Sequence, residues 1–207
     1  AFVGSFNLID RGYLMPGHVR AGRQWVDTFA ELEGPIVESI ESMFAVDWYT
    51  ESGERLDVVG ASEETSISNG DVLQLVPSGP GYLTEPNLRM FNSIVHNAKE
   101  QLTLCSPYFV PEESLLEAIT SACYRGVRVD LFVGEKADQF MVQHAQSAYY
   151  EALLKAGVRI WEFPAPYVLH SKFVLADPGR EGAVGVLGSS NMDIRSFSLN
   201  YESSLLV

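Results

Sequence analysis

The sequence is short of cysteine and of long apolar runs. Its 207 residues contain only two cysteines, Cys105 and Cys123, which are too few for a disulfide framework. We expect both to be reduced, buried thiols. No cysteine–histidine cluster has the spacing of a zinc site, so no metal or other cofactor is implied. No apolar run is long enough to span a bilayer and no signal-peptide pattern is present, so we expect this chain to be soluble.

Basic residues are outnumbered. The chain has 14 Lys and Arg against 27 Asp and Glu, which gives a net charge of -13. This balance argues against a nucleic-acid partner, whose binding surface would be basic. It also argues against electrostatic adhesion of this portion to anionic lipid. A local basic site, such as Lys172 with Arg195, can still bind a phosphate group.

Three motifs near the C-terminal end carry the chemistry. His170 and Lys172 are two residues apart, so on an extended strand they project from the same face. A histidine can serve as nucleophile or acid/base, and a lysine offsets the charge of a phosphate. Ser189 and Asn191 add short neutral donors on a Gly-led turn. Glu202 is placed to accept a hydrogen bond from a ring nitrogen of a histidine. The alternative for His170 is a satisfied core histidine.

This pattern resembles a known family. His-x-Lys-x4-Asp, then Gly-Ser-x-Asn and a Glu, is similar to the signature of the phospholipase D superfamily. The surrounding sequence resembles its bacterial cardiolipin synthase branch, in the stretches HSKFVLAD, GSSNMDIRSFSLNYE, SPYFVPEESLLEAI and SAYYEALLKAGVRIWEF. The resemblance covers nearly the whole chain.

An internal repeat accompanies the motifs. Residues 4–11 and 188–195 place Gly, Ser, Asn, an apolar residue and Arg at the same positions, which indicates two copies of one unit. The first copy has no His-x-Lys strand, because that strand would precede Ala1, and His18 has no Lys two residues on. We therefore expect a fragment. Residues 1–50 are the C-terminal remnant of a first repeat, 51–70 a linker, and 71–207 a second repeat truncated at its C-terminus.

Strand and helix patterns alternate in the second repeat. Apolar runs at 101–105, 127–133 and 158–163 are separated by helical patterns at 112–125 and 138–155. Alternation of this kind predicts an α/β fold: a phospholipase D-like mixed, mainly parallel sheet flanked by helices on both faces. Further strands are expected at 1–4, 25–32, 71–76, 183–187 and 200–207, and helices at 35–49 and 86–99. Residues 11–24 are expected to form a loop, and the apolar stripe of helix 35–49 to be core.

The resemblance implies a role for each site residue. The catalytic set is His170, Lys172, Asn191 and Glu202, and the substrate-binding set is Ser189, Ser5, Asn7 and Tyr108. Tyr108 and Phe109 would wall a lipid pocket, with a packed turn as the alternative. Asp27 would orient an imidazole, with a solvated strand residue as the alternative. Asp177 would be structural. For Arg195 two roles stay open, which are stabilising its own turn and binding a lipid headgroup.

The resemblance also implies the reaction. One histidine attacks a phosphodiester and forms a phosphohistidine, while the other protonates the leaving alcohol and deprotonates the incoming one. In cardiolipin synthesis this transfers a phosphatidyl group to phosphatidylglycerol, without a metal. Which histidine is the nucleophile stays open, as do the acceptor and the oligomeric state.

We expect the parent protein in a bacterial cell membrane, held by segments outside this chain, and we expect this fragment to be inactive alone. A homodimer that brings two copies of His170 together would supply the missing histidine, but we favour this arrangement less. The alternatives are hydrolysis of phosphodiesters by the same site, and a non-catalytic domain that binds phosphate or a partner.

Overall fold

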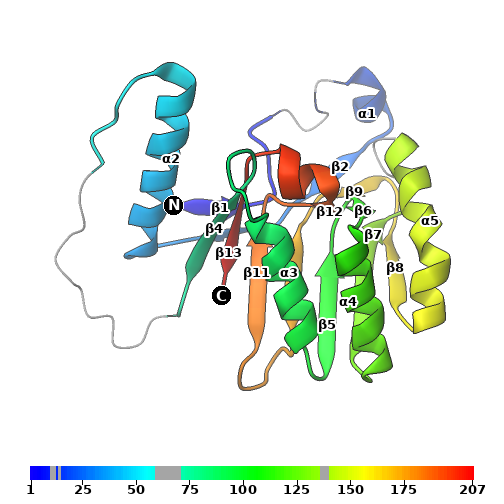
Figure 1. The fold of residues 1–207 in the computed structure, drawn as a ribbon. Helices are drawn as coiled ribbons and strands as arrows, with labels where there is room; N and C mark the ends of the chain where they lie inside the picture. Colours follow the sequence, from blue (N-terminus) through cyan, green and yellow to red (C-terminus); the bar gives the residue numbers. More distant parts are fainter. Residues whose placement is uncertain (10–12, 14, 59–70, 136–139) are drawn as a thin grey trace.

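A computed structural model describes residues 1–9, 13, 15–58, 71–135 and 140–207, of which 140–143 are described as backbone (Figure 1). The helices are α1 (Pro16–Arg20), α2 (Ile36–Ser52), α3 (Pro86–Asn97), α4 (Glu113–Tyr124), α5 (Phe140–Ala156) and the π-helix η1 (Arg195–Leu199). The strands are β1 (Phe2–Gly4), β2 (Gln24–Val26), β3 (Phe29–Glu31), β4 (Gln74–Ser78), β5 (Gln101–Cys105), β6 (Phe109–Val110), β7 (Arg128–Gly134), β8 (Arg159–Phe163), β9 (Tyr167–Leu169), β10 (Phe173–Ala176), β11 (Val184–Gly188), β12 (Met192–Asp193) and β13 (Glu202–Leu206). None of the described helices is long and apolar enough to cross a membrane.

A seven-stranded mixed sheet with flanking helices organises the chain, as the sequence predicts. Its strand order is β4-β13-β11-β10-β5-β7-β8. The β5–β7 and β7–β8 pairs are parallel, and the other four pairs are antiparallel. The expectation of a mainly parallel sheet is therefore wrong. The neighbouring strands β5, β7 and β8 are joined in turn by the helices α4 and α5, whereas the neighbours β10 and β11 are joined directly by a turn.

The main core lies between one face of this sheet and α3, α4 and α5. Apolar side chains alternate along β5, β7 and β10, so that Leu104, Leu131 and Val174 point toward the helices and are at most 1% exposed. In α3 and α4 the buried residues recur at helical spacing. Each fully buried Leu or Val contributes roughly 1.5–3 kcal/mol, and this cluster therefore fixes the sheet that carries the site.

The opposite face carries a smaller cluster. Leu205 points away from α3, and it packs against Val3 of β1 and Leu32, with Ile36 and Ile40 of α2 beside them. Helices therefore lie on both faces of the main sheet. Among the described helices, α2 covers this second face, at the β4 end of the sheet (Figure 1). The expectation that the α2 stripe is core is wrong, because α2 has no buried residue.

The internal repeat is visible in the backbone. β1 pairs antiparallel with β3 as β11 pairs with β13, and Gly4 faces Phe29 as Gly188 faces Ser204. A Cβ on Gly4 would lie 2.4 Å from the carbonyl oxygen of Thr28, and one on Gly188 would lie 2.3 Å from that of Ser203. Glycine is thus required at both positions because two backbones approach too closely for any side chain.

The expected strand 25–32 is two strands. β2 pairs with β9 and β3 pairs with β1, and the chain bends between them at Asp27 and Thr28. The bend has a local cause: the Ser5 hydroxyl accepts a hydrogen bond from the backbone nitrogen of Thr28 at 2.9 Å and donates to its carbonyl at 3.2 Å. The expected loop 11–24 likewise contains α1.

Other expectations fall partly outside the described residues. The predicted linker 51–70 lies mostly there, and α2 extends through its first two residues to Ser52. Both cysteines are free thiols as expected, although Cys123 is only half-buried. Burial raises the pKa of the Cys105 thiol to about 12. The division into a remnant and a second repeat stays a prediction.

Candidate phosphate site at the junction of the two repeats

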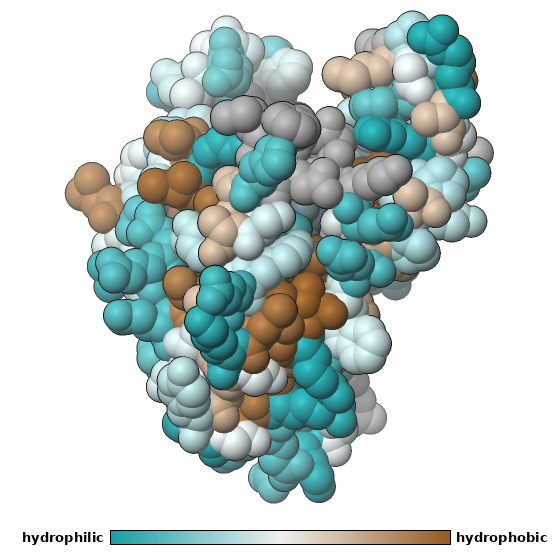
Figure 2. Space-filling view, turned by 90° about the vertical axis from the view of Figure 1, so that its right-hand side faces the viewer, coloured by the Kyte–Doolittle hydropathy of each residue, from teal (hydrophilic) through white to brown (hydrophobic). Residues whose placement is uncertain are grey.

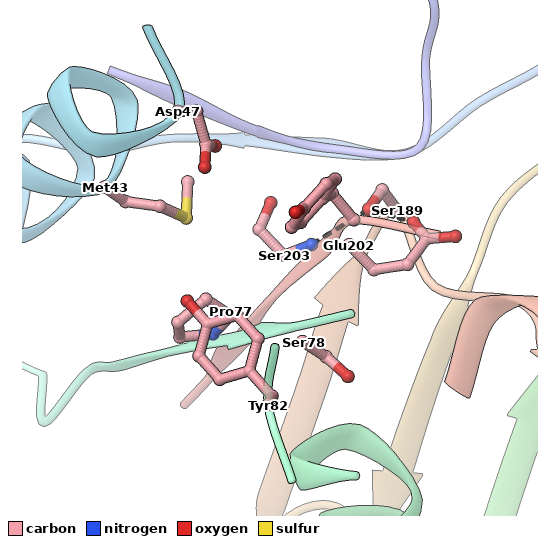
Figure 3. Close-up of a pocket in the computed structure, with 9 residues that line it drawn as sticks. Met43, Asp47, Pro77, Ser78, Tyr82, Ser189, Glu202 and Ser203 are labelled. Atoms are coloured by element: carbon pink, nitrogen blue, oxygen red, sulfur yellow. Dashed lines mark hydrogen bonds between the residues drawn. The ribbon is translucent and has the colours of Figure 1, made fainter. Parts of the chain in front are cut away.

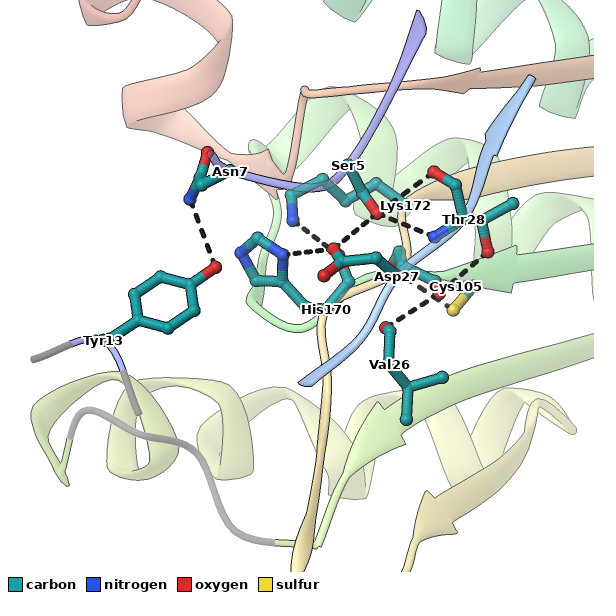
Figure 4. A network of polar contacts seen from close by, with 10 residues as sticks. Ser5, Asn7, Tyr13, Val26, Asp27, Thr28, Cys105, His170 and Lys172 are labelled. Atoms are coloured by element: carbon teal, nitrogen blue, oxygen red, sulfur yellow. Dashed lines mark hydrogen bonds and ion pairs between the residues drawn. The ribbon is translucent and has the colours of Figure 1, made fainter. Parts of the chain in front are cut away.

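The imidazole of His170 is held by a carboxylate from the other repeat. Its Nδ1 lies 2.6 Å from Asp27 Oδ1, and the Ser5 hydroxyl donates to the same oxygen at 2.8 Å (Figure 4). Burial opposes ionisation of Asp27, but its hydrogen bonds to His170 and Ser5 and the charges of His170 and Lys172 outweigh burial and lower the pKa of this carboxyl. An ionised Asp27 fixes the proton on Nδ1 and leaves Nε2 as the reactive nitrogen.

Short parallel pairing places the ring. β2 and β9 run side by side, and the backbone nitrogen of His170 donates to Val26 O at 2.9 Å. Ser171 donates to the same carbonyl at 3.0 Å and accepts from Thr28 Oγ1 at 2.9 Å. His170 and Lys172 were expected on one strand, but they lie in the crossing between β9 and β10. The crossing passes from the small β2–β9 sheet into the main sheet, which aims both side chains at the junction.

Lys172 lies between the two carboxylates. Only 5% of the residue is exposed, and its Nζ donates to the backbone oxygen of His170 at 2.6 Å. Its charge lowers the pKa of both Asp27 and Glu202, although for Glu202 burial outweighs it. A buried ammonium beside an imidazole and two carboxylates is suited to holding an anionic group that adds further negative charge.

Glu202 makes no hydrogen bond with His170, and its expected role in orienting an imidazole stays a prediction. The Ser189 hydroxyl donates a short hydrogen bond to Glu202, and Asn200 Nδ2 donates to it at 3.4 Å. Burial raises the pKa of this carboxyl, despite the hydrogen bonds from Ser189, Ser196 and Asn200. The structure therefore gives the orienting contact on His170 to Asp27.

The surroundings of the two carboxylates share three hydrogen bonds. We name Ser5, Val26, Asp27 and Thr28 the Asp27 half-site, and Ser189, Tyr201, Glu202 and Ser203 the Glu202 half-site. In each, the serine hydroxyl donates to the carboxylate. The backbone nitrogen of the serine donates to the carbonyl oxygen of the residue that follows the carboxylate, which is Thr28 or Ser203. The backbone nitrogen of that following residue donates to the serine hydroxyl. The distances are 2.9 Å for both backbone contacts of the first half-site and 3.0 Å for both of the second.

The two half-sites differ in what fills them. His170 and Ser171 occupy the Asp27 half-site. A cavity of about 110 Å³ adjoins the Glu202 half-site instead, and all four of its residues line that cavity (Figure 3). Asp47 of α2 and Tyr82 form its far walls. None of the described residues lining it is a histidine.

The expected substrate-binding residues divide into two groups. Ser5 and Ser189 donate their hydroxyl protons to carboxylates, so they position those groups. Asn7 donates to the Tyr13 hydroxyl at 3.3 Å, on the open side of His170 (Figure 4). The side-chain oxygen of Asn191 is buried without a hydrogen-bond partner among the described residues.

Tyr108 is half-buried and lies under the Arg195 guanidinium, whose carbon is 5.7 Å from the ring centroid. Arg195 also donates to Asp193 at 3.2 Å, which ties it to its own turn. Phe109 was expected in the pocket wall but is fully buried and paired with Met192, so the packed-turn alternative describes it.

Asp177 lies at the far end of β10 from His170. Its carboxylate accepts hydrogen bonds from the backbone nitrogens of Lys99, Glu100 and Gln101 at 2.7–2.9 Å. These contacts tie the end of β10 to the start of β5. Its backbone is left-handed, with φ of 50°.

Sequence reasoning missed an aromatic group beside His170. Tyr13 stacks on Trp25 with centroids 4.4 Å apart and meets His170 edge-on at 6.2 Å. His18 packs on the other side of Trp25 at 5.3 Å. No motif marks these residues, because they lie in three different short pieces of the chain: Tyr13 before α1, His18 in α1 and Trp25 in β2. Among the described residues, no cluster of His, Cys, Asp and Glu is arranged to hold a metal ion.

The fold and the site together define a duplicated α/β protein of the phospholipase D-like class. A family model described as "Cardiolipin synthase, PLD-like domain" matches residues 92–207, which is more than half of the chain. The chain belongs to this family.

Relatives and solved structures agree with this assignment. The chain is 37% identical over 215 residues to cardiolipin synthase A of Yersinia pseudotuberculosis serotype O:1b (strain IP 31758), and equally to that of Yersinia pestis. The match covers 100% of this chain and 42% of each relative, so the chain spans less than half the length of these proteins.

Two solved structures share the fold. Nuc from Salmonella typhimurium, a phospholipase D family member, has a TM-score of 0.52 at 18% identity, over 65% of this chain and 81% of its own. Polyphosphate kinase from Porphyromonas gingivalis has a TM-score of 0.50 at 20% identity, over 66% of this chain and 23% of its own.

Proposed function

We propose that this chain supplies one imidazole, and most of the phosphate site, of a two-histidine phosphatidyl transferase of the cardiolipin synthase type. The observation that carries the proposal is the match between the two half-sites. One of them holds His170, and the other has an equivalent set of hydrogen bonds beside a cavity. A second imidazole, on a polypeptide segment that packs against residues 199–201 as β9 packs against β2, would occupy that cavity and bind Glu202.

The two imidazoles divide the reaction. One attacks the phosphorus of phosphatidylglycerol, and the bond to the glycerol headgroup breaks. The other gives its proton to the departing alkoxide, and a phosphohistidine remains. It then takes a proton from the free glycerol hydroxyl of a second phosphatidylglycerol, whose oxygen displaces the histidine. The products are cardiolipin and glycerol, and both imidazoles return to their starting state.

The residues near His170 have distinct parts in this scheme. Asp27 holds Nδ1, so Nε2 is the nitrogen that meets the phosphate. Lys172 offsets the charge of the phosphate oxygens. The side-chain amides of Asn7 and Asn191 are neutral groups that would donate hydrogen bonds to those oxygens. Glu202 would hold the second imidazole as Asp27 holds the first.

The proposal predicts that the 207-residue chain alone has no transfer activity, because one imidazole is absent. A longer protein with both His-x-Lys motifs should convert phosphatidylglycerol vesicles into cardiolipin and release glycerol. In that protein His170→Ala should lower turnover by at least about 10³-fold, which is a typical effect of losing an acid/base or nucleophile.

The products decide the outcome. Robust cardiolipin formation by the isolated chain, lost in His170→Ala, would contradict the division of the site between two segments. Phosphatidic acid in place of cardiolipin, at saturating phosphatidylglycerol, would contradict transfer and indicate hydrolysis. His96→Ala is a suitable control, because His96 is exposed in the last turn of α3, at the end of that helix which leads into the start of β5 and not at the site.

A further inference from the structure

Two short helices lie in equivalent places in the two repeats. α1 belongs to the segment between Asn7 and Asp27, and η1 to the segment between Asn191 and Glu202. Each therefore connects a Gly-Ser-x-Asn turn with its orienting carboxylate. Figure 1 shows both at the same end of the molecule, where the strands β1, β11 and β4 reach the site.

Both segments expose apolar side chains. Met15, just before α1, is 55% exposed, and Val19 within α1 is 64% exposed. Ile194, just before η1, is 53% exposed, and Leu199 within η1 is 65% exposed. Leu83, in the turn after β4, is 99% exposed. At the opposite end the connection from β10 to β11 has the sequence DPGREGA, without a large apolar residue. Figure 2 shows hydrophobic residues projecting at the upper left, a second hydrophobic patch below the centre of this face, and hydrophilic residues at the lowest end.

Other exposed apolar residues near the site have a different explanation. Leu8 is 95% exposed, but its equivalent in the second repeat is Met192, which is 2% exposed and paired with Phe109. A first-repeat strand would cover Leu8 in the same way. A first-repeat strand would not cover Leu199 in this way. Its equivalent in the first repeat, Gln24, is paired with Tyr167 and still stays exposed.

The net charge of the chain opposes adhesion to anionic lipid, but the local charge around α1 is positive and favours an anionic lipid surface as the partner there. No acidic residue occurs between positions 13 and 26, whereas Arg20 and Arg23 do, in a chain with a net charge of -13. Arg195 begins η1, and its side chain is 45% exposed. Short amphipathic segments that combine apolar side chains with arginines bind at the headgroup layer, where the guanidinium meets phosphate and the apolar groups enter the acyl boundary.

We propose that α1 and η1 form a membrane-contact rim, consisting of Met15, Val19, Ile194 and Leu199 with Arg20, which inserts into the surface of a phosphatidylglycerol-containing bilayer. Tyr13, two residues before Met15, meets the His170 ring edge-on, and α1 and η1 lie at the same end of the molecule (Figure 1), so insertion brings the site to the depth of the lipid phosphates. A phosphodiester then reaches His170 without leaving the bilayer surface. This inference rests on the proposed function for its choice of lipid, and it adds the means by which the site meets a membrane substrate.

Flotation of the 207-residue chain with vesicles tests the rim directly. The chain should bind vesicles of phosphatidylcholine that contain phosphatidylglycerol. Val19→Ser combined with Leu199→Ser should weaken this binding by about tenfold or more, since each substitution removes an apolar group from the interface. Arg20→Gln should weaken it about fivefold, and only when phosphatidylglycerol is present. The matched control is Val72→Ser combined with Leu154→Ser, at positions 89% and 57% exposed and away from the rim, which should bind unchanged.

Two results would overturn the rim: absence of binding to phosphatidylglycerol vesicles, or equal binding by the Val19→Ser/Leu199→Ser variant and the unchanged chain. Thermal unfolding of the variants checks that they remain folded. Two separate readouts distinguish this inference from the proposed function: vesicle binding by the 207-residue chain, and cardiolipin formation by the longer protein. If rim-dependent binding is found but the longer protein makes no cardiolipin, the proposed function fails and the rim stands. If cardiolipin forms without rim-dependent binding, the reverse holds.

Discussion

The two orienting carboxylates have pKa values shifted in opposite directions. Asp27 contacts an imidazole and its pKa is lowered, whereas Glu202 contacts neutral donors and burial raises its pKa. A raised pKa in the folded state means that the stability Glu202 contributes is present below its unfolded value, near 4.5, and is lost as the pH rises. Glu202→Gln should therefore be as stable as the unchanged chain in acid and more stable at neutral pH. Thermal unfolding midpoints across this range measure the difference.

Asp27→Asn is the matched control, and its sign is opposite. The lowered pKa of Asp27 means that its contribution is present above 3.8 and is lost as the pH falls through the folded value. The variant should lose about 1–2 kcal/mol at neutral pH, from a charge-assisted hydrogen bond that is partly exposed, and the loss should shrink in acid. If both variants shifted stability in the same direction with pH, the two carboxylates would not differ as described.

Single residues also mark the limit of sequence reasoning. The motifs located His170, Lys172, Asn191, Glu202 and Asp27 without coordinates, because each falls at a fixed place in a repeated pattern. The pairing of His170 with Asp27 was not predictable. Spacing along the chain does not state which repeat's carboxylate crosses to which imidazole.

At the scale of elements, β1 and β11 each end at a glycine where two backbones lie too close for a side chain. Gly188→Ala would place a Cβ 2.3 Å from the Ser203 carbonyl, and neither backbone can yield without breaking the β11–β13 pairing. We expect a loss of about 2–3 kcal/mol or more in the free energy of unfolding, measured by urea denaturation. The displacement should also disturb Ser189.

Gly185→Ala is the control in the same strand. Its Cβ would meet only the end of the Leu175 side chain, at an ordinary 3.8 Å. The variant should change stability by less than about 1 kcal/mol. Equal losses from the two substitutions would show that glycine serves β11 through its flexibility and not through close approach.

Helices and strands were predicted best where a period is long and regular. The expected positions of α3, α4, β5, β7 and β8 agree with the structure to within a few residues. The prediction that most strands run parallel was wrong, because an alternating pattern is the same whichever way a strand runs. The exposure of α2 was not predicted either, since its apolar stripe has the same spacing whether or not a partner covers it.

At the scale of the whole molecule, the two repeats contact each other through three different kinds of interaction. Val3 and Leu32 pack on Leu205, β2 pairs with β9, and Asp27 binds His170. Residues 1–50, the predicted remnant, contain the β1–β3 pair, and a two-stranded ribbon is marginal in water without a surface to cover. Its structure therefore depends on the second repeat, and the pattern in the sequence gave no sign of this dependence.

This dependence predicts that the chain unfolds as one unit. Trp25 lies in the remnant, whereas the far-ultraviolet circular dichroism of the chain comes largely from α3, α4 and α5. In a variant with Trp48→Phe and Trp161→Phe, which keeps Trp25 as the fluorescent reporter, urea should give the same midpoint by fluorescence and by circular dichroism. Leu205→Ala, which opens the apolar contact between the repeats, should lower the free energy of unfolding by about 2–4 kcal/mol. Both urea midpoints should therefore fall together. A fluorescence transition at lower urea than the dichroism transition would mean that the remnant comes off first, and that His170 is then without the carboxylate that orients it while the rest of the sheet is still folded.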